Sequence, residues 1–339
     1  MTSTGGSGGL TERSGSPPVD HAPRPGPLLA VGETMALLTA AEIGRLRHVS
    51  SLTLGVAGAE SNVAIGARRL GCPAAWVGRV GADELGELVV SRIRAEGVDV
   101  GGVVRDPGAP TSLMLKERRT AGMVRVLYYR RNGPGSRLLP GDLDPAQVAA
   151  AGVLHVTGIT PALSDSALAT VDRAVTLAQE AGVPVSFDVN YRSALWPPDR
   201  AAAVCRDLAT RADMVFAGDD EAGMLGLTGD PAALARGLAD LGAGHAVVKL
   251  GPRGAVAAVD GRVHAVEPVP VQAVDPVGAG DAFVAGYLAE TLAGRPVPER
   301  LATAAACGAF AVTVPGDWEG LPSRDELATL GHRPGTVQR

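Results

Sequence analysis

The sequence predicts an α/β fold, in which a mostly parallel central sheet is flanked by helices and carries a small antiparallel flap. From residue 28 onward, short apolar runs alternate with longer amphipathic segments, which is the pattern of buried strands joined by crossover helices. Two stretches break this alternation with strand-like patterns and no helix between them. The alternating part predicts the sheet with its helices, and the two exceptions predict the flap.

The expected strands of the central sheet are short apolar runs, as in parallel strands that are covered on both faces. They comprise residues 28–31, 74–77, 153–156, 183–187, 214–217 and 246–250. The expected helices comprise residues 61–70, 84–96, 166–181, 201–209, 231–241, 282–292 and 299–312. Ligands of such sheets bind beyond the carboxyl ends of the strands, so we expect the functional site there.

The two exceptional stretches span residues 36–54 and 111–130 and would form a lid. In the second, two strand-like segments meet around Ala121 and Gly122, which is typical of a hairpin. A lid over the ligand edge of the sheet would exclude water during group transfer. Its open edge also favours pairing between copies, so we expect a homodimer or a higher homo-oligomer.

Residues 28–330 are expected to form one folded domain between two tails. With 339 residues, of which 46% are hydrophobic, the chain is long enough for a large core. The first 27 residues are rich in Gly, Ser and Pro and contain no apolar segment like that of a signal peptide, so we expect them to be disordered. Residues 331–339 would form a short C-terminal tail.

Composition and charge argue against several classes of protein. The net charge is −5, so nothing indicates binding to nucleic acids or membrane surfaces, and no apolar run is long enough to span a membrane. The three cysteines, Cys72, Cys205 and Cys307, are far apart and match no zinc or disulfide pattern. A reducing cytoplasm is therefore the expected location.

An aspartate beside a predicted anion site is the most informative feature of the chain. In DPVGAGDAF (275–283), a Gly/Ala run leads directly into an apolar, helix-like segment. The backbone amides of Gly278, Ala279 and Gly280 would be free at the helix N-terminus and would bind a phosphate. Asp281 is then explained if it takes a proton from a hydroxyl that attacks a phosphoryl group. A glycine-rich turn capped by an aspartate is the alternative interpretation.

Other classes of phosphate site do not match. Neither lysine of the chain, Lys116 or Lys249, follows a glycine, as a Walker A loop requires. The sequence contains no HRD-type catalytic loop of protein kinases and no convincing GxGxxG between a predicted strand and a helix. The Gly-Ala-Gly-Asp turn is therefore the expected phosphate site.

A second glycine-rich stretch, GVAGAESNVA (55–64), precedes a predicted helix near the N-terminal end of the chain. Asn62 in the first turn of that helix offers donors and acceptors that suit a polyhydroxylated ligand. N-capping of the helix by Ser61 or Asn62 is an equally good interpretation of this stretch alone.

Three segments resemble the signature regions of the ribokinase-like (PfkB) carbohydrate kinases, namely GAESNVAIGARRLG (58–71), VGRVGADELG (77–86) and DPVGAGD (275–281). Within that family, three further segments resemble the kinases of 2-keto-3-deoxygluconate, namely LYYR (127–130), SFDVNYRSALW (186–196) and PGDWEGLP (315–322). The resemblance implies a ribokinase-like fold with a lid. It also implies ATP-dependent phosphorylation of the primary hydroxyl of that sugar acid, giving the 6-phosphate.

The resemblance further implies roles for individual residues. Asp281 would be the general base, and the amides of residues 278–280 would stabilise charge on the transferred phosphoryl group, with ATP and Mg²⁺ as cofactors. The substrate would be bound by Glu33, Gly58, Ala59, Asn62, Tyr128, Arg130, Arg192 and Asp317. Arg130 and Arg192 would hold the carboxylate of the sugar acid, because a guanidinium binds a carboxylate through two parallel hydrogen bonds. In a chain this rich in arginine, solvated surface positions are the alternative.

The nucleotide would be bound by Asn190, Lys249, Gly251, Gly254 and Ala255. All but Asn190 belong to KLGPRGA (249–255), in which a strand end is followed by a glycine turn. A hairpin between residues 246–250 and 255–259 explains the same pattern and is compatible with nucleotide binding.

Two positions depart from the family pattern. Members often carry Asn or Ser three residues before a Glu that organises Mg²⁺ and phosphate waters; here the Glu is Glu221 and the earlier residue is Gly218. Water or Asp219 would take over, so Glu221 is expected to act on the metal indirectly. The small residues that commonly follow the lid arginine are replaced by RNGP (131–134).

The sugar therefore stays open between 2-keto-3-deoxygluconate, 2-keto-3-deoxygalactonate, fructose and ribose. A non-catalytic sugar or nucleotide sensor on the same fold is the remote alternative. A requirement for a monovalent cation near Asp275 stays open as well.

Overall fold

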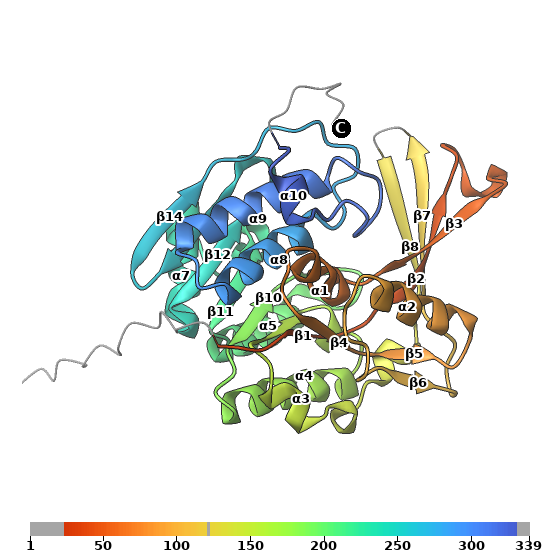
Figure 1. Ribbon diagram of the computed structural model, residues 1–339, viewed down its shortest axis with the longest axis horizontal. Coiled ribbons are helices and arrows are strands. Elements are labelled where there is room, and N and C mark those ends of the chain that lie inside the picture. The colour runs from red at the N-terminus through yellow and green to blue at the C-terminus, as the bar shows by residue number, and fades with distance from the viewer. Residues whose placement is uncertain (1–23, 121–122, 331–339) are drawn as a thin grey trace, which may run out of the picture.

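The computed structural model describes residues 24–120 and 123–330 (Figure 1). Most of the predicted N-terminal tail, the turn at Ala121 and Gly122 and the tail at 331–339 lie outside the described residues. The folded part begins by Arg24 rather than at residue 28, because the Arg24 guanidinium donates to the carbonyl of Ala149 at 2.8 Å and to that of Ala151 at 3.1 Å.

The central sheet contains eight strands in the order β14-β13-β12-β11-β10-β9-β1-β4. The strands are β1 (Leu28–Val31), β4 (Ala74–Val77), β9 (Val153–Thr157), β10 (Val185–Asp188), β11 (Met214–Gly218), β12 (His245–Lys249), β13 (Ala255–Val259) and β14 (Arg262–Val266). The strands from β4 to β12 are parallel, and β13 and β14 are antiparallel additions at one edge. The predicted strands and the β12–β13 hairpin are present. The sequence does not predict β14, because RVHAV alternates and lacks a continuous apolar run.

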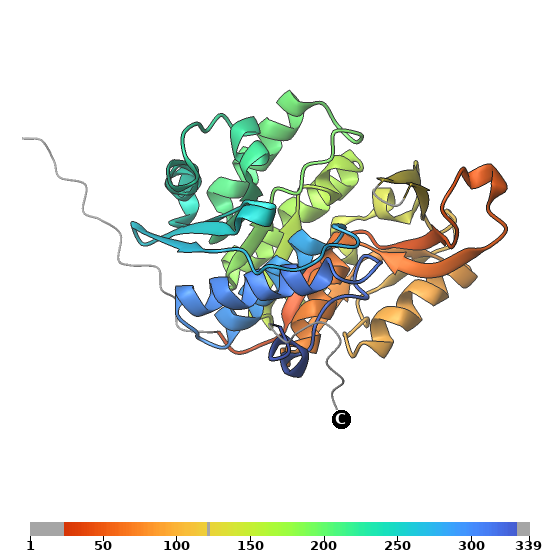
Figure 2. The same cartoon turned by 90° about the horizontal axis from the view of Figure 1, so that it is seen from above.

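Helices lie on both faces of the sheet, as the view from above shows (Figure 2). They bury two separate apolar clusters against it. One cluster contains side chains of α1 (Ala59–Arg69), α2 (Glu84–Ala95), α8 (Ala279–Leu292) and α9 (Val297–Ala311). The other contains side chains of α3 (Pro145–Ala149), α4 (Asp165–Glu180), α5 (Pro198–Arg211), α6 (Asp219–Met224) and α7 (Pro231–Leu238). The predicted sheet covered on both faces is therefore confirmed.

The predicted lid is a separate sheet that projects from one side of the central domain (Figure 1). It consists of β2 (Met35–Ala40), β3 (Leu52–Ala57), β7 (Leu113–Thr120) and β8 (Met123–Tyr129), in the order β3-β2-β7-β8. The outer pairs are antiparallel, as expected, whereas the central pair β2–β7 is parallel. This follows from the chain path, because β2 and β7 both lead away from the central domain and β3 and β8 return to it.

The remaining elements are short. Strand β5 (Arg79–Gly81) pairs with β6 (Val104–Asp106), and α10 (Arg324–Leu327) lies near the end of the described chain. No helix in the part of the chain that the structure describes is long and apolar enough to cross a membrane.

Candidate active site

A cavity of about 1010 Å³ lies between the lid sheet and the carboxyl ends of the central strands, where a ligand of a parallel sheet is expected. Its walls come from the lid, from the loops after β9 to β12 and from the first turns of α1 and α8. Most predicted site residues line it, namely Glu33, Gly58, Ala59, Asn62, Tyr128, Arg130, Asn190, Arg192, Glu221, Lys249, Gly278, Gly280, Asp281 and Asp317.

Four predicted residues do not line the cavity, and the glycines among them have local structural reasons. Gly254 has a φ of +86°, and a Cβ there would lie 2.0 Å from the carbonyl oxygen of Val266. Gly251 also has a positive φ, of +57°, in the same turn between β12 and β13. Ala255 is buried at the start of β13, and Ala279 is the first residue of α8.

The predicted anion site lies at the N-terminus of α8, where the amide of Ala279, one of the three predicted to be free, donates to the carbonyl of Pro276 at 3.4 Å. Gly278 is the N-cap residue with a φ of +79°, and a Cβ there would lie 1.9 Å from the carbonyl oxygen of Asp317. Because a glycine occupies this left-handed position, the helix begins at Ala279, three residues before its predicted start at 282. Gly278 and Gly280 line the cavity, so the positive end of the α8 dipole lies at the cavity wall.

Asp281 lies in that first turn and is 9% exposed. Its Oδ2 accepts a hydrogen bond from Asn62 Nδ2 at 2.8 Å, and its Oδ1 accepts one from Asn190 Nδ2 at 3.4 Å. Burial raises the pKa of Asp281 to about 6, although the Asn62 hydrogen bond and the charge of Arg192 lower it. A carboxylate with this pKa is ionised near neutral pH and is a better base than an exposed aspartate.

The second lysine of the chain lies beside the anion site. Lys249 Nζ donates to Asp188 Oδ2 at 2.6 Å and would lie 3.6 Å from a Cβ placed on Gly280. Burial acts to lower the pKa of Lys249, but the charges of Asp188 and Glu221 outweigh it and raise the pKa. Lys249 is therefore a charged ammonium at the end of β12, next to the amides that would hold a phosphate.

Arg130 carries a buried guanidinium on the lid side of the cavity, with its side chain 10% exposed. Its Nη1 pairs with Glu33 Oε2 at 3.3 Å, and the guanidinium stacks over the Tyr128 ring at 5.1 Å. Within the described residues, Arg130 Nε and Nη2 have no hydrogen-bond partner. Arg192 also lines the cavity but is exposed and donates to the Tyr191 carbonyl.

Glu60 is a cavity residue that the sequence analysis does not identify. It is 1% exposed, and its Oε1 accepts hydrogen bonds from the hydroxyls of Thr157 and Thr160, both at 2.7 Å. Its Oε2 has no partner among the described residues. Burial raises the pKa of Glu60 to about 7 against the lowering effect of the two hydroxyls. The sequence feature that could have identified Glu60 is its position, as an acidic residue two positions before Asn62 in a segment of small residues.

Glu221 caps a helix rather than presenting free oxygens to a metal. Its Oε2 accepts from the Gly218 amide at 2.6 Å, and its Oε1 accepts from the Tyr191 amide at 2.8 Å. In the part of the chain that the structure describes, no three His, Cys, Asp or Glu side chains are grouped to hold a metal ion.

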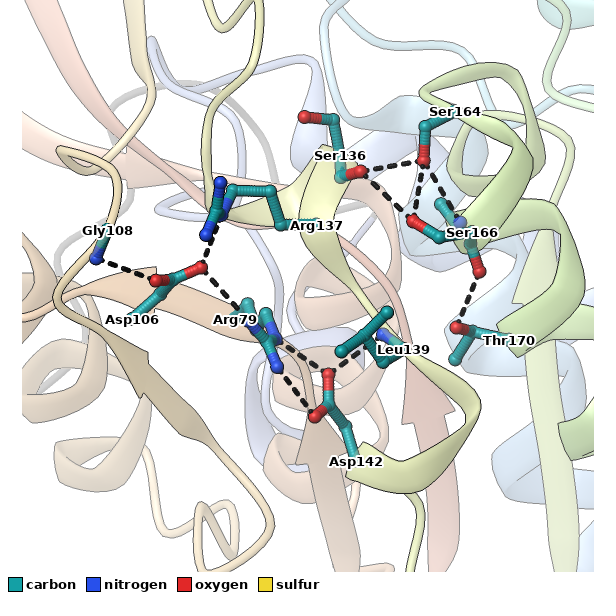
Figure 3. A network of polar contacts seen from close by, with 11 residues as sticks. Arg79, Asp106, Gly108, Ser136, Arg137, Leu139, Asp142, Ser164, Ser166 and Thr170 are labelled. Atoms are coloured by element: carbon teal, nitrogen blue, oxygen red, sulfur yellow. Dashed lines mark hydrogen bonds and ion pairs between the residues drawn. The ribbon is translucent and has the colours of Figure 1, made fainter.

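Arg79 of the VGRVGADELG segment joins Asp106 of β6 to Asp142 in the loop after β8 (Figure 3). Arg79 donates through Nε and Nη2 to the Asp142 carboxylate at 2.7 and 2.9 Å, and through Nη1 to Asp106 at 2.9 Å. Arg137 donates to the same Asp106 at 2.7 Å. These contacts fix the loop after β8, in which Ser136 lines the cavity.

Comparison with known proteins identifies the class to which this site belongs. The sequence matches the profile of the pfkB family carbohydrate kinases over residues 27–324. It is 38% identical to the 2-dehydro-3-deoxygluconokinase of Bacillus subtilis, covering 91% of this chain and 96% of that protein. It is 37% identical to the 2-dehydro-3-deoxygalactonokinase of Haloferax volcanii, covering 86% of this chain and 92% of the relative.

Solved structures agree with this result. A PfkB protein from Polaromonas superposes with a TM-score of 0.82 at 37% identity, covering 90% of this chain and 99% of that one. A putative ribokinase from Escherichia coli, solved with ATP and Mg²⁺, gives a TM-score of 0.83 at 26% identity, covering 90% of this chain and 98% of that one. The protein is a sugar kinase. It belongs to the pfkB family of carbohydrate kinases, as its signature segments predict.

Proposed function

We propose that this kinase transfers the γ-phosphoryl group of ATP to the primary hydroxyl of 2-keto-3-deoxygluconate, giving the 6-phosphate. The observation that carries the choice of sugar is the Arg130 guanidinium, which is buried at the cavity with Nε and Nη2 unpartnered among the described residues. A carboxylate would match these two donors, whereas a neutral sugar would offer them no charged acceptor beyond the Glu33 pair. The relative from Bacillus subtilis, named for 2-dehydro-3-deoxygluconate (the same sugar acid), supports this choice.

Asp281 is the proposed general base for this transfer. The carboxylate would accept the proton of the sugar hydroxyl as that oxygen attacks the phosphorus atom. The Asn62 and Asn190 amides hold both carboxylate oxygens and so fix their direction. Asp317 and Tyr128, which also line the cavity, are proposed to bind the sugar.

The amides at residues 278–280 and the Lys249 ammonium are proposed to stabilise the charge of the transferred phosphoryl group. Loss of one such preorganised donor typically raises the barrier by about 2.7–4 kcal/mol. ATP is expected to bring Mg²⁺, which would neutralise charge on its phosphates. Asp219 and Glu221 border the cavity at the start of α6, so we propose that they contact this Mg²⁺ through water.

A second candidate substrate is 2-keto-3-deoxygalactonate. The relative from Haloferax volcanii is named for this sugar acid and is nearly as similar to this chain. The two acids are epimers with the same carboxylate, so Arg130 would bind both. Selection between them would depend on the groups that meet the sugar hydroxyls, among which Glu60 has a free oxygen.

Two properties outside the reaction complete the proposal. On the lid, Leu54, Leu38, Leu115 and Leu127 are cross-strand neighbours and form one apolar row. Because Leu54 is 48% exposed and the other three are half-buried, we propose that this row pairs two lids in a homodimer.

Cys72, Cys205 and Cys307 are buried free thiols, which supports a reducing, cytoplasmic setting.

A coupled assay of ADP release with MgATP tests the proposed reaction. The panel contains both 2-keto-3-deoxy acids, gluconate, fructose and ribose. The proposal expects the highest kcat/KM for 2-keto-3-deoxygluconate. A preference for fructose or ribose would be consistent with a sugar kinase but would reject the carboxylate role of Arg130. If no sugar of the panel supports ADP release, the proposed substrate is wrong.

A further inference from the structure

Lys116 is an almost completely buried charged side chain that the proposed mechanism does not use. It extends from the lid strand β7, and its side chain is 2% exposed. Its Nζ donates to Asp317 Oδ1 at 2.7 Å and to Asp275 Oδ2 at 3.0 Å. The two aspartates belong to the central domain, before α8 and after α9, so one ammonium joins the lid to two separate loops.

The same two aspartates hold the anion site in place. Asp275 Oδ1 accepts from the Val277 amide at 3.1 Å, and Asp275 Oδ2 accepts from the Gly316 amide at 3.3 Å. The carbonyl of Asp317 lies against Gly278, because a Cβ on that glycine would come within 1.9 Å of it. A displacement of either loop would therefore move the N-cap of α8.

These carboxylates need a cation between them. Asp275 is 7% exposed and Asp317 is 6% exposed, so water screens their repulsion poorly. Burial acts to lower the pKa of Lys116, but the charges of Asp317 and Asp275 and their hydrogen bonds outweigh it and raise the pKa. Lys116 is therefore charged, and its ammonium donates to both acids and reduces the repulsion between them.

We propose that Lys116 is a positioning residue, whose ammonium is the built-in cation that locks the lid to the anion-binding turn and replaces a diffusible monovalent cation at Asp275. The inference rests on the proposed phosphoryl transfer. Breaking a buried ion pair by removing one partner leaves uncompensated charge. Removal of the ammonium would therefore let the loops of Asp275 and Asp317 separate, and the N-terminal amides of α8 would lose their alignment.

Chemical rescue tests this proposal. In Lys116→Ala, we expect kcat/KM to fall at least tenfold. Propylammonium, which matches the missing part of the side chain, should raise the kcat/KM of this variant at least fivefold, and the increase should saturate with propylammonium concentration. Tetramethylammonium at the same ionic strength, which cannot donate a hydrogen bond, should not. Arg118→Ala, a cation removed two residues further along β7, is the matched control and should stay within twofold of the native rate.

The native enzyme supplies the second arm. Its rate should change less than twofold when K⁺ is replaced by Na⁺ or choline. A native enzyme that requires K⁺, or a folded Lys116→Ala that propylammonium and tetramethylammonium affect alike, would overturn the proposal. If Lys116→Ala does not fold, Lys116→Gln keeps a donor without the charge, and a native rate in that variant would also overturn it.

The readout is independent of the choice of sugar. Rates are measured with whichever sugar the native enzyme prefers, and rescue is also measured as a rise in the Tm of Lys116→Ala without any sugar. A Tm that rises with propylammonium and not with tetramethylammonium supports the cation site even where the sugar assignment fails.

Discussion

The Asn62 amide donates to the Asp281 carboxylate at 2.8 Å, and this hydrogen bond joins the first turns of α1 and α8, 219 residues apart in the chain. Asn62 lines the cavity, and its Oδ1 has no partner among the described residues. One residue therefore orients the proposed base and offers an acceptor to a sugar hydroxyl. The two signature segments of the family meet at this contact.

The contact predicts the pH dependence of the reaction. Burial raises the pKa of Asp281 to about 6, and the Asn62 hydrogen bond lowers it. Because a base works only when deprotonated, kcat/KM should rise as pH increases through about 6 and then level off. Asn62→Ala removes a donor to the charged form, so the acid limb of a pH–rate profile should move to higher pH. Asn132→Ala, on the cavity wall, should leave the limb in place; a limb unmoved by Asn62→Ala would contradict the prediction.

Replacement of the proposed base should remove most of the turnover. General-base catalysis contributes about 10²–10⁴ in rate, so kcat of Asp281→Asn should fall by about that factor. The KM for ATP should change only a few-fold, since the substitution keeps the backbone amides and the Lys249 ammonium of the proposed anion site. The measurement is steady-state kinetics with Tm as the fold control, and a variant that keeps a tenth of the native kcat would exclude the role.

Arg130 should discriminate between acidic and neutral sugars. Charge-assisted hydrogen bonds contribute about 1.5–3 kcal/mol each, so Arg130→Met should lower kcat/KM for the 2-keto-3-deoxy acids by at least tenfold. Fructose or ribose turnover should change little. Arg125→Met, which replaces an exposed arginine on β8, the strand that ends just before Arg130, is the matched control. Equal losses for both classes of sugar would show that Arg130 supports the lid rather than a carboxylate.

The sequence predicts the parallel sheet, the lid and Asp281 because each depends on local pattern, namely apolar runs, strand-like segments without helices and a Gly-Ala-Gly turn. It does not predict contacts between distant segments. The resemblance assigns Asn190 to the nucleotide, and the sequence gives no sign that Asn190 also donates to Asp281, where its φ of +39° turns the chain after β10. The importance of Lys116 and Glu60 cannot be predicted from local sequence, because it depends on their burial beside partners from other elements.

Glu60 predicts a measurable effect of pH on stability. Burial raises the pKa of Glu60 from its ordinary value of 4.5 to about 7. Between these values the unfolded chain has lost the proton and the folded chain still holds it, so stability falls as pH rises from about 4.5 to 7. The full difference corresponds to about 3 kcal/mol. Glu60→Gln cannot titrate, so its free energy of unfolding relative to the native protein should increase over this range. Parallel pH dependences in urea titrations would show that Glu60 titrates normally.

Replacement of Gly278 by alanine should cost more stability than backbone strain alone, because it adds a steric contact. An alanine there would combine an unfavourable φ of +79° with a Cβ only 1.9 Å from the Asp317 carbonyl oxygen. Gly261, in the β13–β14 turn, has a similar φ of +74° but open space around its Cα, so Gly261→Ala isolates the strain. We expect Gly261→Ala to cost about 1–3 kcal/mol of stability. Gly278→Ala should cost more and should lower kcat at least tenfold, because the N-cap of α8 must shift. Equal losses of stability and an unchanged kcat in Gly278→Ala would mean that the Asp317 loop yields without moving the anion site.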